Sequence, residues 1–214
     1  MLTNLVDLLL PTRCAACGQP GAPCCAACDA VWGSLTRVTR EPEGPPIYAL
    51  APHRGIPRRL LLAYKERGRR DLAPALGRAL AEAIPLIHPP GKEAWLVPAP
   101  SRKQAARARG GPHMLRLARH AARGLVAAGI PAAVAPALTL ASTAKDAVGL
   151  DRTQRAANLA GNLHWHAAGA PPPASAVVIL DDVVTTGATA AACARTLAGN
   201  GLLVTAVLTL TAAE

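Results

Sequence analysis

The sequence predicts an α/β protein whose parallel sheet carries helices on both faces, preceded by a small cysteine module. Short apolar runs typical of buried strands alternate along residues 46–214 with longer segments whose apolar residues recur at helical spacing. Five of the six cysteines fall within residues 1–32, and the proline- and glycine-rich stretch REPEGPPIY follows them. We therefore expect a cysteine module with its linker over residues 1–45 and a larger α/β domain over residues 46–214.

The elements of the larger domain can be placed from these patterns. In the first half we expect a strand at 47–51, helices over 55–68 and 72–84, a strand at 94–100, a helix over 113–129 and a strand at 132–140. A polar segment then precedes a short strand at 163–166, a strand at 176–180, a helix at 188–199 and a strand at 202–210. Strands that alternate with helices predict a parallel sheet.

Composition narrows the class of protein. The 214 residues are 51% hydrophobic, but the longest apolar run is far shorter than the roughly 20 residues that a membrane span needs. The N-terminal MLTNLVDLLLP has no basic residue before its apolar part and contains Asp7, so we interpret it as a short amphipathic helix, not a signal peptide. With thiols arranged for a metal, this predicts a cytoplasmic protein without membrane insertion.

The formal net charge of +10 and the pI of about 10.1 favour anionic partners such as phosphates or nucleic acid. An alternative is compositional, because a chain rich in arginine and alanine and without phenylalanine is typical of GC-rich coding sequence. Only 2% of the residues are aromatic, which leaves few platforms for stacking single-stranded bases. Charge alone therefore does not identify the partner.

The stretch VVILDDVVTTGAT carries the strongest chemical signal. Ligands of parallel sheets bind at the carboxyl ends of the strands, and here the expected strand VVIL is followed by the expected loop DDVVTTGAT. Asp181 and Asp182 can accept hydrogen bonds from the vicinal hydroxyls of a ribose and hold Mg²⁺ through water. Backbone amides and hydroxyls can bind a phosphate monoester at Thr185, Thr186, Gly187, Ala188 and Thr189. The alternative is structural: Asp182 ends the strand, and Thr185 or Thr186 caps the helix.

A second polar segment, LVPAPSRKQAARARGG, also follows an expected strand. Its basic residues can neutralise an anion that a single nest of amides could not, and they are Arg102, Lys103, Arg107 and Arg109. A solvated basic loop is the alternative.

Two CAAC motifs, Cys14 to Cys17 and Cys25 to Cys28, are separated by seven residues. Four thiolates in this pattern predict a structural Zn²⁺ site, which a short segment with few large apolar side chains needs in order to fold. Disulfides or a lost site are the alternatives, and Cys24 can replace Cys25 as a ligand. We expect Cys193 to be a small core residue.

These residues carry a family resemblance. VVILDDVVTTGAT resembles the signature with which type I phosphoribosyltransferases bind phosphoribosyl pyrophosphate (PRPP), and the whole chain, with its cysteine module in front, resembles the ComF family. The resemblance implies a type I phosphoribosyltransferase fold with a small zinc-ribbon module. It also implies a PRPP site that is formed by Asp181, Asp182, Val183, Thr185, Thr186, Gly187, Ala188, Thr189, Ala99, Ser101 and Arg109.

Two further segments resemble parts of such enzymes. LVPAPSRKQAARARGG is similar to the family segment VPVP…RGFNQ, which faces the pyrophosphate of PRPP, although Gly111-Pro112 stands where the family usually has Phe-Asn. AKDAVGLDRTQRAANLAGN is similar to the flexible catalytic loop of the superfamily, which closes over PRPP and excludes water. The resemblance implies that Lys145, Arg152 and Arg155 reach the pyrophosphate, while Asn158 fixes the base of the loop.

The resemblance leads to two hypotheses of different classes. In the first, a phosphoribosyltransferase uses PRPP and Mg²⁺ to transfer ribose 5-phosphate to an unknown acceptor, and its catalytic residues are Asp181, Asp182, Lys145 and Arg155. In the second, a non-catalytic DNA-uptake (competence) factor binds single-stranded DNA and keeps PRPP as a regulatory ligand. A third reading makes the zinc module a docking site for a helicase-like partner. Residues 47–90 carry no signature that would identify an acceptor.

Overall fold

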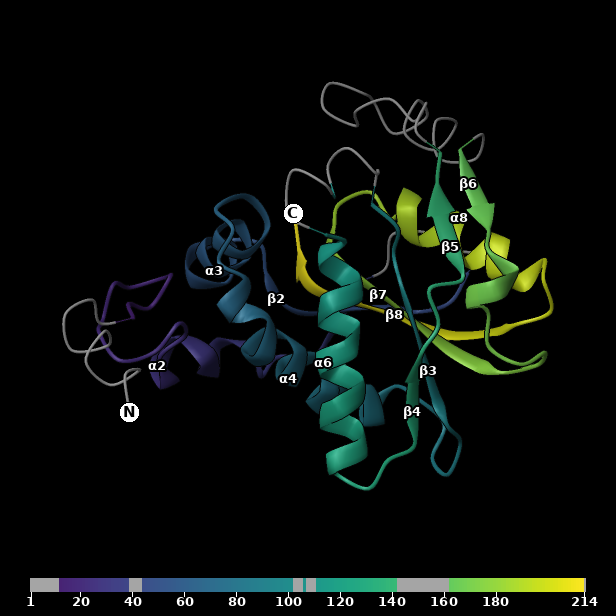
Figure 1. Cartoon of the computed structure of the whole chain (residues 1–214), viewed down its shortest axis with the longest axis horizontal. Coiled ribbons are helices and arrows are strands. Elements are labelled where there is room, and N and C mark those ends of the chain that lie inside the picture. Colours follow the sequence, from purple (N-terminus) through teal and green to yellow (C-terminus); the bar gives the residue numbers. More distant parts are fainter. Residues whose placement is uncertain (1–11, 39–43, 102–105, 107–110, 142–161, 214) are drawn as a thin grey trace.

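The computed structural model describes residues 12–38, 44–101, 106, 111–141 and 162–213 (Figure 1). Its centre is a six-stranded sheet in the order β1-β2-β8-β7-β3-β4. The strands are β1 (Thr36–Arg37), β2 (Ile47–Pro52), β3 (Ala94–Pro98), β4 (Ala132–Val134), β7 (Ala176–Val184) and β8 (Leu203–Ala212). Neighbouring strands of this sheet are parallel except β1 and β2. The predicted α/β class, with a mostly parallel sheet, is confirmed.

Helices cover both faces of the sheet, as predicted. α3 (Gly55–Glu66), α4 (Ala73–Ala83) and α6 (His113–Ala127) pack against one face, and α8 (Ala188–Ala198) packs against the other (Figure 1). Side chains of a strand alternate between faces, so Val178 and Leu180 of β7 enter the first core while Val177 and Ile179 enter the second. Burial on both faces explains why β7 begins as an uninterrupted apolar run.

The first core depends on close contact between α4 and α6. A Cβ atom on Gly77 would lie only 2.3 Å from Cβ of His120, and one on Gly124 would lie 3.1 Å from Cβ of Ala81. The two glycines therefore let the helices approach each other more closely than larger residues would allow. Two short 3₁₀ turns flank α4: η2 (Arg70–Leu72) directly precedes it, and η3 (Ile84–Leu86) directly follows it.

The sequence predicts one strand over residues 132–140, but the structure has two strands there, so this prediction is wrong. β4 leaves the main sheet before Pro136, and β5 (Leu138–Leu140) pairs antiparallel with β6 (Leu163–Trp165) in a separate two-stranded sheet. Pro136 has no N–H to continue the ladder, whose last bond here runs from the Ala135 N–H to the Leu96 carbonyl oxygen. The extra sheet packs on the α8 side of the molecule.

The predicted end of the strand at residue 180 is also wrong. β7 continues to Val184, because Asp181 pairs with Thr209 and Val184 pairs with Ala212 on β8. The two aspartates therefore lie within the strand, and only residues 185–187 separate it from α8.

The cysteine segment packs directly on the larger domain. It contains α2 (Ala26–Asp29) and the 3₁₀ turn η1 (Ala30–Trp32), and Trp32 is buried in the core between the sheet and the helices. The Arg78 guanidinium pairs with the Asp29 carboxylate, and Arg69 Nη2 donates to the Arg13 carbonyl oxygen at 2.9 Å. The division of the chain near residue 45 stays a prediction.

Across the described ranges, no helix combines the length and the apolar character that a membrane crossing requires.

Candidate functional site

The stretch that follows β7 forms a turn at the carboxyl edge of the sheet. Gly187 is the N-cap of α8 and has φ of 82°, a left-handed conformation that glycine adopts without strain. Thr185 is exposed, whereas Thr186 and Thr189 are partly exposed. The first amides of a helix lack partners within the helix, so the start of α8 can bind an anion between these hydroxyls. Phosphate binding by residues 185–189 stays a prediction.

Asp182 is buried, with 6% of the residue exposed, and a lysine and a histidine contact its carboxylate. Oδ2 lies 2.6 Å from Nζ of Lys65 on α3 and 2.9 Å from Nε2 of His113, the first residue of α6. Burial alone would raise the pKa of Asp182, but the hydrogen bond from His113 and the charge of Lys65 together lower it below its ordinary value. The carboxylate is therefore ionised and is bound by groups of the protein itself.

The contacts of Asp182 join β7 to α3 and α6, and a further hydrogen bond links the two helices to each other. The Tyr64 hydroxyl on α3 donates to the His113 carbonyl oxygen at 2.9 Å, and the two rings pack at a centroid distance of 6.3 Å. Asp182 thus ties β7 to both α3 and α6. Lys65 and His113 were missed in the sequence because they lie far from the aspartates and belong to no short motif.

Asp181 differs from its neighbour in orientation and in charge. Successive residues of a strand point to opposite faces, which places Asp181 on the α8 side with Val177 and Ile179, and Asp182 on the α6 side. Asp181 is partly exposed, and its Oδ1 accepts the backbone N–H of Asp182 at 2.8 Å. Burial and the charge of Asp182 raise the pKa of Asp181 to about 7. Both carboxylates therefore lie in the strand, one partly exposed and one buried, and their role in ligand binding stays a prediction.

His53, another residue missed in the sequence, continues this network at the end of β2. Its Nδ1 lies 2.9 Å from Oγ1 of Thr211, and that hydroxyl donates to the Asp182 carbonyl oxygen at 3.4 Å. Because the hydroxyl proton of Thr211 is used in the second bond, the ring of His53 donates in the first. Burial, reinforced by the charge of Arg58, lowers the pKa of His53.

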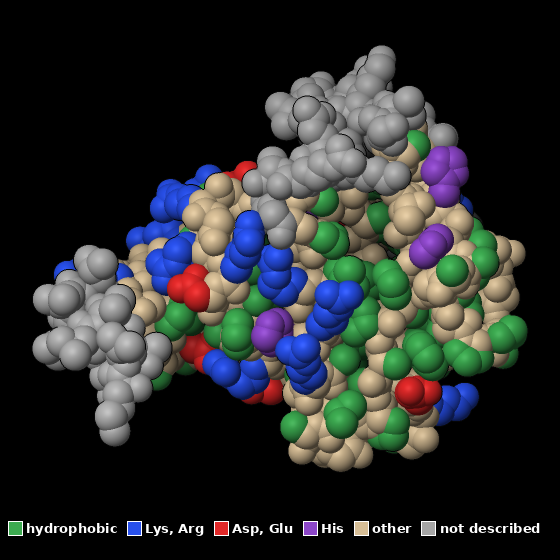
Figure 2. All heavy atoms as spheres, viewed as in Figure 1, with side chains coloured by type: hydrophobic (Ala, Val, Ile, Leu, Met, Phe, Trp, Pro, Cys, Tyr) green, Lys and Arg blue, Asp and Glu red, His purple; other side chains and the backbone are tan. Residues whose placement is uncertain are grey.

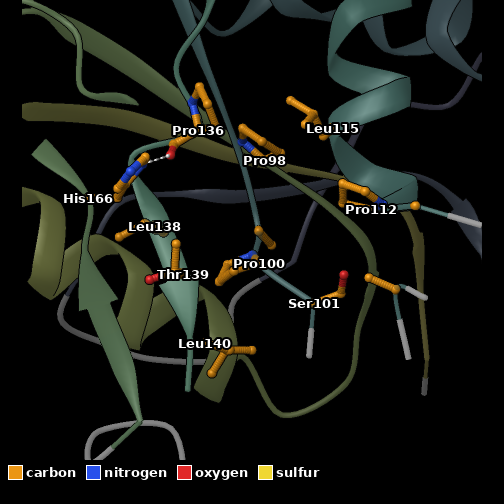
Figure 3. A pocket seen from close by; sticks show the side chains of 13 residues that line it. Pro98, Pro100, Ser101, Pro112, Leu115, Pro136, Leu138, Thr139, Leu140 and His166 are labelled. Carbon is orange, nitrogen blue, oxygen red and sulfur yellow. Dashed lines mark hydrogen bonds between the residues drawn. The ribbon is translucent and has the colours of Figure 1, made fainter. Parts of the chain in front are cut away.

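A cavity of about 760 Å³ opens where β3 ends, between the start of α6 and β5 (Figure 3). The Ala99 N–H donates to the Leu180 carbonyl oxygen at 2.8 Å, so the end of β3 lies directly against the strand that carries Asp181. The lining residues are Pro98, Ala99, Pro100, Ser101, Ala106, Gly111, Pro112, Leu115, Pro136, Leu138, Thr139, Leu140 and His166. Ala99 and Ser101, which the sequence predicts for the PRPP site, thus line this cavity.

The remaining predicted site residues lie outside the described part of the chain. They are Arg102, Lys103, Arg107, Arg109, Lys145, Arg152, Arg155 and Asn158. Their roles stay predictions.

The four cysteines of the CAAC motifs come together as predicted. The Sγ atoms of Cys14, Cys17, Cys25 and Cys28 all lie within 4.8 Å of one another, and those of Cys17 and Cys25 are 3.6 Å apart. A tetrahedral zinc site with Zn–S bonds of about 2.3 Å has sulfur atoms roughly 3.8 Å apart, so these thiols fit Zn²⁺. Each of the six cysteines, all within the described residues, is a free thiol.

The geometry also decides between the two adjacent cysteines. Cys25 joins the cluster, whereas Sγ of Cys24 lies 3.9 Å from Oδ1 of Asp29 and packs against the core. Cys193 is buried in the second core, as expected.

Comparison with known proteins gives solved structures that resemble the chain. Adenine phosphoribosyltransferase of Thermoanaerobacter pseudethanolicus is 18% identical, with 86% of each chain covered and a TM-score of 0.37. A second adenine phosphoribosyltransferase is 16% identical over 88% of this chain and 90% of that chain, also with a TM-score of 0.37. The enzyme of Saccharomyces cerevisiae, solved with an imino-altritol bisphosphate and adenine, is 17% identical over 87% and 90%, with a TM-score of 0.36. No family model and no curated protein matches the chain.

Asp182→Asn tests the buried carboxylate. We expect it to lower the free energy of unfolding by about 3 kcal/mol at pH 7, because Lys65 would lose its compensating charge and His113 its ionised hydrogen-bond acceptor. The folded pKa of Asp182 is depressed, so its contribution is present above the ordinary value of 3.8 and is lost as the pH falls below it. Urea unfolding at several pH values measures this. Asp71→Asn, which breaks the exposed pair with Arg69, is the control and should have little effect.

Zinc content tests the cysteine cluster. We expect one Zn²⁺ per chain by native mass spectrometry, and a lower melting temperature after treatment with a strong chelator, because the binding free energy of the metal then no longer stabilises the folded chain. Cys17→Ser should lose the metal, while Cys24→Ser should retain it. Retention of zinc by the first variant and its loss by the second would contradict the assignment.

Proposed function

We propose that the chain binds PRPP with Mg²⁺ and transfers its ribose 5-phosphate to an acceptor, with release of pyrophosphate. The observation that carries this proposal is the order of groups along the end of β7. An accessible carboxylate, Asp181, stands four residues before the hydroxyl-bearing turn that leads into α8. A sugar phosphate needs acceptors for its hydroxyls and donors for its phosphate, and this stretch supplies the two in that order.

The 5-phosphate would be held at the start of α8. Gly187 would allow the main chain to approach the anion closely, and Thr185, Thr186 and Thr189 would add their hydroxyls to the helix amides. The Thr186 hydroxyl already accepts the Ala188 N–H at 3.4 Å. The positive end of the helix dipole adds to this attraction.

Asp181 would accept hydrogen bonds from the ribose hydroxyls and hold Mg²⁺ through water, since hard cations bind carboxylate oxygens. When bound, Mg²⁺ neutralises charge on the departing pyrophosphate. Asp182 would act as a positioning residue, because Lys65 and His113 occupy its carboxylate.

The proposed transfer mainly requires that the protein position the reactants and stabilise the charge that develops. The bond from the anomeric carbon to pyrophosphate breaks, and the electron pair leaves with the pyrophosphate. The lone pair of the acceptor then forms the new bond. Positive charge develops at the sugar during this step, and the anionic form of Asp181 stabilises it.

PRPP with Mg²⁺ should raise the melting temperature of the wild type, and Asp181→Asn should remove most of that increase. Because the pKa of Asp181 is about 7 in the free protein and the ligand binds its ionised form, affinity should rise about tenfold from pH 6 to pH 8. Asp181→Asn should lack this part of the pH dependence, as measured by calorimetry.

Asp71→Asn, an exposed aspartate on η2, is the matched control and should bind PRPP like the wild type. A wild-type protein that PRPP does not stabilise at any pH in this range would disprove the proposal.

A second candidate function rests on the surface charge. Figure 2 shows Lys and Arg side chains gathered over α3, α4 and α6 on the viewed face. Arg119 and Arg123 are exposed on α6, which has no acidic residue, and Arg58 and Arg59 are exposed on α3. Such a surface fits a phosphate backbone, so we propose single-stranded DNA as its ligand, with PRPP in a regulatory role.

Charge reversal tests this candidate. Arg119→Glu with Arg123→Glu should weaken binding of a labelled oligothymidylate by tenfold or more and reduce the dependence of affinity on salt, by roughly one unit of slope for each lost phosphate contact. Fluorescence anisotropy at several salt concentrations measures both effects. Arg195→Glu, on α8 across the sheet, is the control. Because two Arg→Glu changes alter the net charge by −4 and the single change by −2, a loss of binding free energy in the control that is half that of the double variant would show that only net charge matters.

A further inference from the structure

The four clustered thiols differ in their access to solvent. Cys14 and Cys28 are buried, with 3% and 2% of each residue exposed, whereas Cys17 is exposed and Cys25 is partly exposed. A small oxidant such as hydrogen peroxide therefore reaches Cys17 before the other thiols of the cluster. Thiolates react with peroxides much faster than thiols do, and bound Zn²⁺ requires its cysteine ligands in the thiolate form.

Cys25 is the thiol best placed to form a disulfide with Cys17. The Sγ atoms of the two residues are 3.6 Å apart, and they come from different CAAC motifs. A disulfide has an S–S distance of about 2.05 Å, so a movement of roughly 1.5 Å would join them. The cluster would then keep two thiolates, which are too few for a tetrahedral zinc site.

The backbone next to the cluster is bonded to the end of α3, on the side of the molecule where α2 and α3 lie (Figure 1). Arg13 directly precedes the first CAAC motif, and its carbonyl oxygen accepts Nη2 of Arg69 at 2.9 Å. The Arg69 N–H donates at 3.1 Å to the carbonyl oxygen of Ala63, in the last turns of α3. Because Lys65 of the same turns pairs with Asp182, a short series of bonds runs from the cluster to the carboxyl edge of the sheet.

The loop that carries Arg13 has little core of its own. Residues 12–25 include no Leu, Ile, Val, Met or aromatic side chain, so apolar burial contributes little to their order. Metal ligation would therefore supply much of the stability of this loop. Trp32 and the ion pair of Asp29 with Arg78 lie after the second motif and would keep α2 and η1 in place without it.

We propose that Cys17 and Cys25 are a peroxide-sensitive pair whose oxidation releases the predicted Zn²⁺ and loosens the end of α3. The Cys17 thiolate attacks a peroxide oxygen, the O–O bond breaks, hydroxide leaves, and the sulfur becomes a sulfenic acid. The Cys25 thiolate attacks that sulfur, the S–O bond breaks, and a second hydroxide leaves. The two thiolates lose two electrons, each hydroxide takes up a proton to become water, and a thiol reductant reverses the change.

Peroxide treatment of the zinc-loaded full chain tests this chemistry. We expect the Zn²⁺ to be released, as followed with a chromogenic chelator, and peptide mapping to find Cys17 joined to Cys25. Dithiothreitol with added Zn²⁺ should reverse both changes. A disulfide within one CAAC motif, or oxidation without a disulfide, overturns the inference.

Cys17→His separates metal binding from oxidation. Three cysteines and one histidine also form a common zinc site, so this variant should hold Zn²⁺ and release it about tenfold more slowly in peroxide. Cys24→Ser, at the neighbouring thiol outside the cluster, is the matched control and should respond like the wild type. Equal release from Cys17→His and the wild type overturns the inference, and if the variant binds no metal, the disulfide mapped in the wild type decides.

Hydrogen exchange tests the link to α3. Oxidation should make the amides of residues 63–66 exchange about tenfold faster, because the bond from Arg69 to Arg13 is lost. In Arg69→Met that bond is absent from the start, so oxidation should change the exchange of these amides by less than about twofold. Asp71→Asn, which alters only the exposed partner of Arg69, is the control and should behave like the wild type. Zinc release without faster exchange, or a full response in Arg69→Met, overturns the inference.

The inference rests on the predicted zinc site and not on the proposed transfer reaction. A chain that carries Zn²⁺ and keeps it in peroxide overturns the inference and leaves the metal site in place. A chain that binds no Zn²⁺ overturns both, while neither result bears on the binding of PRPP.

Discussion

The buried carboxylate of Asp182 is the constraint on which the edge of the sheet depends. It holds Lys65 at 2.6 Å and His113 at 2.9 Å, and so joins β7 to the helices α3 and α6. A buried charge is stable only when it is paired and hydrogen-bonded, so these helices cannot move away from β7 without exposing or orphaning it. The start of α6 and the end of α3 are thereby fixed relative to the strand that carries the candidate site.

The continuation of β7 through the acidic pair gives its members different properties. Pairing with β8 as far as Val184 sends adjacent side chains to opposite faces of the sheet. Asp182 stays ionised between Lys65 and His113, whereas burial and the charge of its neighbour raise the pKa of Asp181 to about 7. The carboxylate that a ligand can reach is therefore one whose charge responds to ligands near neutral pH.

The surfaces near the carboxyl edge of the sheet differ in charge and polarity. The turn into α8 suits an anion, while the cavity at the end of β3 has apolar walls. The exposed arginines of α3 and α6 form a third surface, on the face opposite α8. The segment with the cysteine cluster packs on the same side of the sheet. Trp32 enters the core there, and Asp29 forms an ion pair with Arg78 of α4.

The sequence by itself determined the features that local pattern encodes. Alternating apolar runs specify strands and helices, the spacing of two CAAC motifs brings four thiols together, and a glycine between threonines marks the start of α8. Prediction from the sequence failed where a feature depends on residues that are distant in the chain. Strand length beyond Leu180 is set by pairing with β8, and the state of Asp182 is set by Lys65 and His113, which no short motif connects to it. Only the tertiary structure decided which acid is accessible, because burial and charge depend on neighbours in space.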